Sequence, residues 1–196
     1  MLMLMIAAAA AGGLKVDPDS GNNKFDATFD APLGEMIVAT SSSVGCEVTW
    51  QNGTASGTCS VPLTSIMVDN EPTKTEHFQQ WVTNKKVDPK KCTIDAKFDK
   101  IPLAIPGKFE GDAAFTVCGK PGIEKVTGNA IELPDGRVRI RARVERFNRD
   151  KYKVGPKYTE GWLSRVQQLA PVVAEEGTVV ISLFAKLVET KSARKP

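Results

Sequence analysis

Short runs of alternating apolar and polar residues, separated by turn residues, constrain the fold of this chain more than any other feature. The run Lys24-Phe25-Asp26-Ala27-Thr28-Phe29-Asp30 alternates with the period of two that is typical of a strand with one buried face. Gly, Pro and Asn-Gly turns separate this run from the next, which indicates an antiparallel sheet. We expect strands over residues 24–30, 36–40, 46–50, 54–66, 93–98, 114–117, 126–133, 137–147 and 178–188.

The number of these strands predicts a closed sheet. About eight strands in one domain favour a barrel or a sandwich. The chain of 196 residues is 41% hydrophobic and 25% charged, which suits one buried core and excludes a disordered or collagen-like chain. The sequence shows no internal repeat and no linker between domains, so we expect one all-β domain.

Two segments depart from the strand pattern and predict helices. Residues 69–72 (DNEP) offer a capping residue followed by a proline in the first helical turn. A helix is therefore expected from about Pro72 to Val82, with an apolar face formed by Phe78, Trp81 and Val82. Before Pro171, a second short helix is predicted by the spacing of Trp162, Val166 and Leu169.

The first eleven residues are all apolar, and small residues follow (MLMLMIAAAAAGG). Such a run resembles the hydrophobic region and cleavage site of a secretory signal, and it is too short to span a bilayer as a helix. No Lys or Arg precedes the run, so a buried N-terminal strand or helix is the alternative. We expect a signal peptide over residues 1–13, a folded domain over 14–190 and a polar, basic tail over 191–196.

Four cysteines, Cys46, Cys59, Cys92 and Cys118, lie beyond this leader, without the close pairs that are typical of zinc sites. An even number of cysteines in an exported chain indicates disulfides. A hairpin centred on Asn52-Gly53 places Cys46 opposite Cys59 at a non-hydrogen-bonded position, where Cα atoms are close enough to bridge. Cys92–Cys118 follows by elimination, and free buried thiols are the alternative.

Charge and motif content exclude several classes of protein. A net charge of +3 is low for a nucleic-acid-binding protein, and few aromatic residues accompany the basic ones. The only histidine is His77, which excludes a metal site built from several histidines. Phosphate-binding loops, nucleophile elbows and clustered carboxylates are absent from the sequence. We therefore expect a binding protein that is not an enzyme and has no metal, no resident cofactor and no nucleic-acid partner.

The most regular strand is RVRIRARV, residues 137–144, which presents Arg137, Arg139, Arg141 and Arg143 on one face. Residues 137–157 hold nine basic and two acidic residues. A solvated outer face, on which arginine stems cover apolar surface, explains this pattern. The alternative is a docking surface for an anionic membrane or for an acidic protein partner.

An ordered series of motifs runs through the chain: Ser56-Gly57-Thr58, residues 61–66, Asp69-Asn70-Glu71 with Glu76-His77-Phe78, and residues 92–98, 115–121, 147–152 and 178–188. This series resembles the YceI-like family, the polyisoprenoid-binding, lipocalin-like proteins of bacterial envelopes. The resemblance spans residues 14–190, and the four cysteines and the long segment 154–176 depart from the family pattern.

The resemblance implies an eight-stranded antiparallel barrel with one or two short helices and an elongated apolar interior. It implies a periplasmic carrier of a long-chain isoprenoid-type lipid, such as a polyprenyl chain or a quinone. The alternative is a non-catalytic subunit of an envelope complex with a filled barrel, which would use the arginine strand and the 154–176 loop as its interface. The exposed strands also permit a homodimer.

Candidate ligand-binding residues follow from strand alternation and from the motif matches. Apolar side chains on the inner face of each strand would line a tunnel, and two aromatic residues of the helix would close one end. Core packing is the alternative for the apolar residues, and a structural hydrogen bond is the alternative for His77. The predicted set is Phe25, Phe29, Phe78, Trp81, Phe98, Ile140, Ala142 and Val144, with His77 and Arg149 at the mouth.

Overall fold

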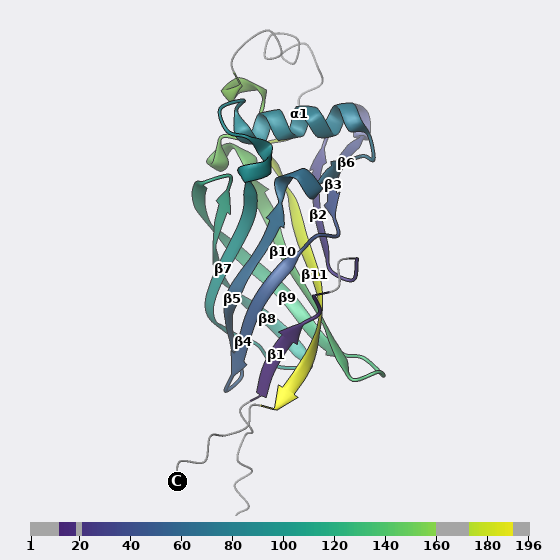
Figure 1. The fold of residues 1–196 in the computed structure, drawn as a ribbon, viewed down its shortest axis with the longest axis vertical. Coiled ribbons are helices and arrows are strands. Elements are labelled where there is room, and N and C mark those ends of the chain that lie inside the picture. Colours follow the sequence, from purple (N-terminus) through teal and green to yellow (C-terminus); the bar gives the residue numbers. More distant parts are fainter. Residues whose placement is uncertain (1–11, 19–20, 160–172, 190–196) are drawn as a thin grey trace, which may run out of the picture.

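The computed structural model describes residues 12–18, 21–159 and 173–189. Within these ranges, one antiparallel sheet of eleven strands rolls into an elongated barrel, and a helix lies across one end (Figure 1). The helix is α1 Pro72–Thr83. The strands are β1 Gly12–Val16, β2 Lys24–Asp30, β3 Met36–Ser41, β4 Gly45–Gln51, β5 Thr54–Pro62, β6 Met67–Val68, β7 Thr93–Pro102, β8 Gly107–Val117, β9 Lys120–Glu132, β10 Arg137–Asn148 and β11 Glu176–Glu189.

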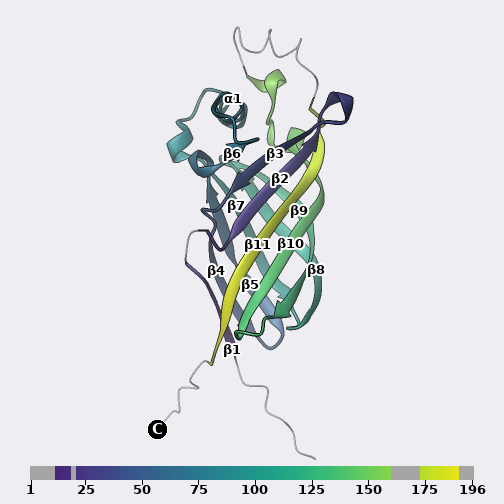
Figure 2. The same cartoon turned by 90° about the vertical axis from the view of Figure 1, so that its right-hand side faces the viewer.

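The strand order is β4-β5-β7-β8-β9-β10-β11-β2-β3-β6, and β11 is long enough to pair with two strands along one edge. Its first half pairs with β2 and its second half pairs with β1. β1 also lies beside β4, the first strand of the order, at the end of the barrel opposite α1 (Figures 1 and 2). The short strand β1 therefore lies between β11 and β4 and brings these two strands together at this end of the barrel.

The structure confirms the all-β, lipocalin-like fold but corrects the expected number of eight strands, since eleven lie within the described residues. β1 and β6 are too short to give a recognisable alternation. β1 also includes Gly12 and Gly13, which the expected leader contained. β8 begins at Gly107 rather than at residue 114, because small inward residues such as Gly111 hide the pattern. The strand expected over 54–66 ends at Pro62, where a 3-10 turn follows.

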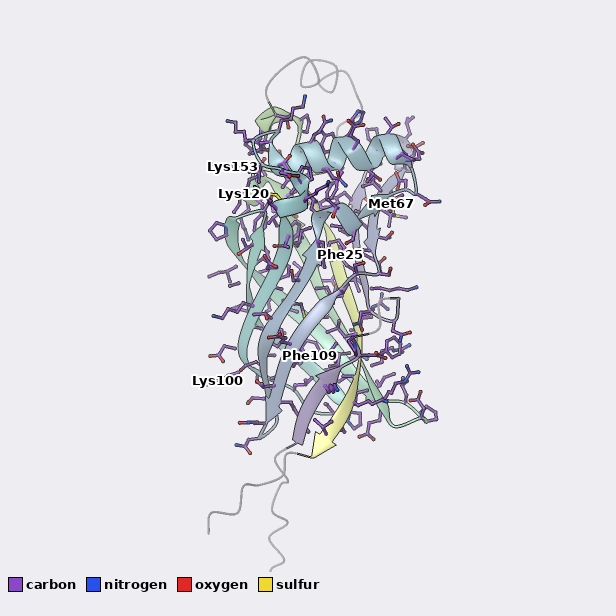
Figure 3. All side chains as sticks on the ribbon, viewed as in Figure 1. Phe25, Met67, Lys100, Phe109, Lys120 and Lys153 are labelled. Carbon is purple, nitrogen blue, oxygen red and sulfur yellow. A yellow bond between two sulfur atoms is a disulfide. The ribbon has the colours of Figure 1, made fainter. Side chains whose placement is uncertain are left out.

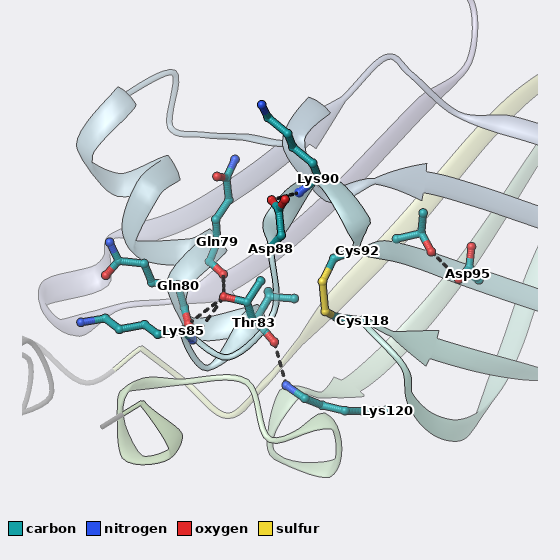
Figure 4. Close-up of a disulfide and its surroundings, with 12 residues drawn as sticks. Gln79, Gln80, Thr83, Lys85, Asp88, Lys90, Cys92, Asp95, Cys118 and Lys120 are labelled. Carbon is teal, nitrogen blue, oxygen red and sulfur yellow. Dashed lines mark hydrogen bonds between the residues drawn. A yellow bond between two sulfur atoms is a disulfide. The ribbon is translucent and has the colours of Figure 1, made fainter. Parts of the chain in front are cut away.

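Both predicted disulfides are present. Cys46 and Cys59 are opposed in the β4–β5 register and bonded, with Cα atoms 4.1 Å apart. Asn52 and Gly53 both have positive φ, at 51° and 73°, as the predicted turn requires. The Cys92–Cys118 disulfide joins the residue before β7 to the β8–β9 turn, close to the C-terminal end of α1 (Figure 4).

The helix α1 begins at the predicted proline and ends one residue beyond the prediction. The expected side-chain cap is wrong, because the first turn of α1 has no side-chain cap. Asp69 instead accepts hydrogen bonds from the Val38 N–H at 2.8 Å and the Lys74 ammonium at 2.9 Å, which join the start of α1 to β3. At the other end, the Lys120 ammonium donates to the Val82 carbonyl at 2.7 Å (Figure 4). The second predicted helix lies outside the described residues.

Strand alternation separates an apolar interior from a polar exterior. Inward side chains such as Phe25, Val138 and Leu183 are buried, whereas outward side chains such as Lys100 are exposed (Figure 3). None of the helices in the described ranges is long and apolar enough to cross a membrane. The functional question is therefore what the barrel interior and the barrel exterior can bind.

Candidate functional site: two apolar cavities in the barrel

A cavity of about 390 Å³ lies beneath α1. Helix α1 contributes Phe78 and Trp81 to its wall, β2 contributes Phe25 and Phe29, and β3 contributes Ile37. Its volume falls within the range of roughly 300–1,000 Å³ that is usual for small-molecule sites. We call it the wide cavity.

A second cavity of about 90 Å³, the narrow cavity, lies deeper in the barrel and is lined from β4, β5 and β7–β11. Arg143 is its only lining residue that is not apolar. The space exists because several inward positions carry alanine, which leaves the interior unfilled. These positions are Ala55, Ala96, Ala113 and Ala142. An apolar void of this kind stays dry and accepts apolar ligands.

Phe115 of β8 and Val179 of β11 line both cavities. The Phe115 ring packs against Phe147, with the ring centroids 6.1 Å apart. The two cavities therefore adjoin at these side chains. A ligand that occupies both must pass Phe115 and Val179.

All ten predicted ligand-binding residues lie on the cavity walls. Their contact with a ligand stays a prediction. Six line the wide cavity: Phe25, Phe29, His77, Phe78, Trp81 and Arg149. Four line the narrow cavity: Phe98, Ile140, Ala142 and Val144.

The sequence prediction missed several lining residues. Phe115 and Val179 occupy inward positions of predicted strands, so the same alternation argument would have included them. Lys74 and Glu35 also line the wide cavity. These two lie outside the predicted strands, so only the placement of α1 and of the β2–β3 turn brings them to the cavity.

Arg149 is the most constrained polar residue of the wide cavity, with 8% of its surface exposed. Its Nε donates to the Ala174 carbonyl at 2.9 Å, Nη1 to Val154 at 2.7 Å and Nη2 to Val173 at 2.7 Å. Burial lowers the pKa of Arg149, but a guanidinium remains charged. Three of its five N–H groups hold the chain at residues 154 and 173–174, and the other two have no acceptor among the described residues.

The other polar groups of the wide cavity are Lys74 and His77 on α1 and Glu35 before β3. Lys74 forms ion pairs with Asp69 at 2.9 Å and Glu71 at 3.2 Å, and these hydrogen bonds raise its pKa. Within the described residues, the His77 imidazole makes no hydrogen bond. Basic groups thus outnumber acidic ones here, and all of them come from the end that α1 covers.

A buried polar cluster supports the turn that carries Arg149. The hydroxyl of the fully buried Tyr152 donates to Glu124 at 2.6 Å, and the Lys151 ammonium donates to the same carboxylate at 2.7 Å. The Tyr152 ring stacks on Phe147 with a centroid distance of 5.0 Å. Burial raises the pKa of Tyr152, which keeps the hydroxyl protonated as a donor. This cluster fixes the turn against β9.

The arrangement suits non-covalent binding of an apolar molecule. The two adjoining cavities are lined mainly by apolar side chains. The polar groups of the wide cavity are gathered at the end that α1 covers. No group of three or more His, Cys, Asp or Glu side chains that could hold a metal ion is found among the residues described. The fold and the cavities together define a β-barrel whose interior holds two adjoining apolar cavities.

Comparison with solved structures identifies the same fold. BcnA of Burkholderia cenocepacia matches with a TM-score of 0.65 and 14% identity, covering 87% of this chain and 100% of that one. A polyisoprenoid-binding domain from Saccharophagus degradans, implicated in plant cell wall breakdown, matches with a TM-score of 0.60 and 13% identity, covering 90% and 98%. A Campylobacter jejuni YceI protein, in a mutant form, matches with a TM-score of 0.46 and 11% identity, covering 76% and 82%.

No known family model and no curated protein matches this sequence. The structural matches nevertheless confirm the expectation drawn from the motifs at the level of fold. The chain has the fold of BcnA and of the Saccharophagus degradans polyisoprenoid-binding domain. The two disulfides indicate an oxidising, exported compartment.

Proposed function

We propose that the protein is a periplasmic carrier that holds one long-chain, isoprenoid-type lipid inside the barrel. The observation that carries this proposal is the pair of adjoining apolar cavities, which differ in volume and have polar groups at one end. The fold of a polyisoprenoid-binding domain supports the same ligand class. The disulfides and the leader-like residues 1–13 support export to the periplasm.

The positions of the polar groups orient the ligand. The two N–H groups of Arg149 that have no acceptor within the described residues, together with Lys74 and His77, offer hydrogen-bond donors and positive charge at the α1 end. The ligand therefore has an acceptor-bearing end group, such as a carbonyl, hydroxyl or phosphate, beneath α1. Its tail points toward the narrow cavity, where each buried methylene contributes about 0.8 kcal/mol.

The junction between the cavities determines which tails fit best. A short tail fills the wide cavity alone, whereas a longer one must pass Phe115 and Val179 into the narrow cavity. Specificity then depends on the length and width of the tail rather than on recognition of each atom. Ligand selection of this kind needs no catalytic group.

Mass spectrometry of the protein purified from the envelope of its own host tests the proposal. The native mass should exceed the denatured mass by one lipid, which fragmentation would identify. The denatured mass also reports whether the leader is removed. A native mass without a lipid, or with a second polypeptide only, would contradict the carrier.

A pair of adjacent substitutions makes the test specific to the cavity. Ala27 lines the wide cavity, and Thr28 points to the opposite face of β2. We expect Ala27→Phe to lower the amount of co-purified lipid severalfold and Thr28→Phe to leave it unchanged. Equal lipid in both variants would show that the lipid binds elsewhere.

A filled barrel that serves as an accessory subunit is not favoured, because the wide cavity leaves the interior unfilled. Most of the 154–176 loop, which that alternative would use, lies outside the described residues. Self-association into a homodimer stays a prediction, and the native mass measures it in the same experiment.

A further inference from the structure

The sheet register gathers basic side chains on one outer wall of the barrel. A level is a row of residues that the strand pairings place side by side across the sheet. The level of Arg141 contains Lys108 of β8, Asn129 of β9, Arg141 of β10, Ser182 of β11 and Lys24 of β2. Three of these residues are basic and none is acidic. Lys108, Asn129 and Arg141 also line one shallow hollow on the outer surface.

The same wall continues toward the end of the barrel opposite α1. One level along, Arg139 is flanked by Ile131 and Phe184. At the next level the register aligns Arg137, Lys186 and Lys15. We call this surface the basic wall, and its members are Lys15, Lys24, Lys108, Arg137, Arg139, Arg141 and Lys186.

Few acidic groups compensate the basic wall. Arg137 pairs with Asp135 at 2.7 Å, and no ion pair of the other six residues is found in the described part of the chain. The wall ends at the level of Arg143, where the register brings in Asp26 and Glu110. With seven of the 26 Lys and Arg on this wall, the rest of the chain holds nineteen against 23 acidic residues.

The end of the barrel next to the wall adds apolar surface. Leu187 and Val188, at the end of β11, are 40% and 41% exposed. Basic groups of the wall and exposed apolar side chains thus lie at the same end of the molecule, away from α1 (Figure 1).

We propose that the basic wall binds the surface of an anionic phospholipid bilayer. Four of its seven residues are lysines, which are depleted at protein–protein interfaces, and its one aromatic neighbour, Phe184, lies beneath the Arg137 guanidinium. The wall therefore lacks the exposed aromatic anchor that is typical of a protein-binding surface. Dispersed basic residues beside exposed apolar side chains match the interface of an anionic membrane.

This contact leaves the ligand site free. The wall covers the flank formed by β8–β11, β1 and β2, whereas the wide cavity lies beneath α1 at the other end (Figures 1 and 2). Binding of the outer wall to a membrane therefore does not depend on which lipid occupies the barrel interior.

Vesicle co-sedimentation tests this inference with the full chain. Phosphatidylcholine vesicles with and without phosphatidylglycerol are the probes. We expect binding only when phosphatidylglycerol is present, and we expect it to weaken at high salt, because exposed charges are screened. The triple variant Arg139→Gln, Arg141→Gln, Lys186→Gln should bind these vesicles roughly a hundredfold more weakly.

A matched triple variant, Lys85→Gln, Lys90→Gln, Lys91→Gln, removes the same number of exposed charges at the α1 end of the barrel, away from the wall. It should change vesicle affinity by at most about threefold. An equal loss in both variants would overturn the proposal, since net charge rather than the wall would then drive binding. Failure to bind phosphatidylglycerol, combined with salt-sensitive binding of polyglutamate, would instead assign the wall to an acidic protein. The lipid carried inside the barrel is measured in a separate experiment. Failure of the proposed carrier function can therefore be told apart from failure of the proposed membrane contact.

Discussion

Filling the narrow cavity should stabilise the protein and at the same time shorten the ligand that it accepts. Ala142 of β10 points into this cavity, which has a volume of about 90 Å³. The substitution Ala142→Leu adds three carbon atoms to that void. If the void accommodates a ligand tail, alanine at this position makes the unliganded protein less stable than leucine would, but it leaves space for the ligand.

Two independent estimates give the size of the effect. At about 24 cal/mol per Å³, complete filling of a 90 Å³ void corresponds to about 2 kcal/mol. Three buried carbon atoms at about 0.8 kcal/mol each give a similar value. For a chain of this length, 2 kcal/mol corresponds to an increase in Tm of about 6 °C.

The assay compares urea unfolding of the delipidated protein with the chain length of the lipid bound by the loaded protein. We expect Ala142→Leu to raise the free energy of unfolding and to shift the bound lipids toward shorter tails. The control is Ala114→Leu, which makes the same change at an exposed position of β8. A destabilised Ala142→Leu variant, as overpacking would produce, or a stabilised one that binds unchanged tail lengths, would refute the reasoning.

Three further predictions concern the supports of the site. Arg149→Lys cannot satisfy three separate carbonyls, so thermal unfolding should show a loss of about 3 kcal/mol, and unchanged stability would contradict the role assigned to Arg149. Replacing Cys46 and Cys59 together with serine should lower the free energy of unfolding in urea by about 3 kcal/mol, whereas an unchanged urea midpoint would show that the bridge adds nothing. Although burial acts to raise the pKa of Asp69, hydrogen bonds from Val38 and Lys74 hold it below its usual value. The stability that the ionised Asp69 carboxylate adds to the fold is therefore present above about pH 4, and it is lost as the pH falls through the folded-state pKa. Asp69→Asn should flatten this part of the stability–pH curve, and an identical acid limb in both proteins would argue against it.

Local sequence patterns determined much of the fold. The Asn52-Gly53 turn sets the register of the β4–β5 hairpin, because positive φ at both positions fixes where the chain reverses. The bridge between Cys46 and Cys59 follows from that register alone. Alternation likewise assigned Phe25, Phe29 and Ile140 to the interior, since successive side chains of a strand point to opposite faces.

Patterns that are too short or too weak left gaps in the prediction. β1 and β6 carry too few residues for a period to emerge, so the strand count was too low. Both depend on neighbours distant in sequence, because β1 pairs with β11 and β6 pairs with β3. Hydrogen bonds from a neighbouring strand can hold such a short strand in place, so its own sequence need not show apolar–polar alternation.

The sequence by itself determined which face of each strand is apolar, where two hairpin cysteines meet and where α1 begins. Only the tertiary structure decided the roles of residues whose partners are far away. Arg149 binds carbonyls of residues 154, 173 and 174, and Lys74 reaches the wide cavity through the position of α1. The basic wall likewise exists because the register of six strands, β8–β11, β1 and β2, brings its basic side chains together. Alternation fixes the direction of a side chain, but closure of the barrel fixes its neighbours.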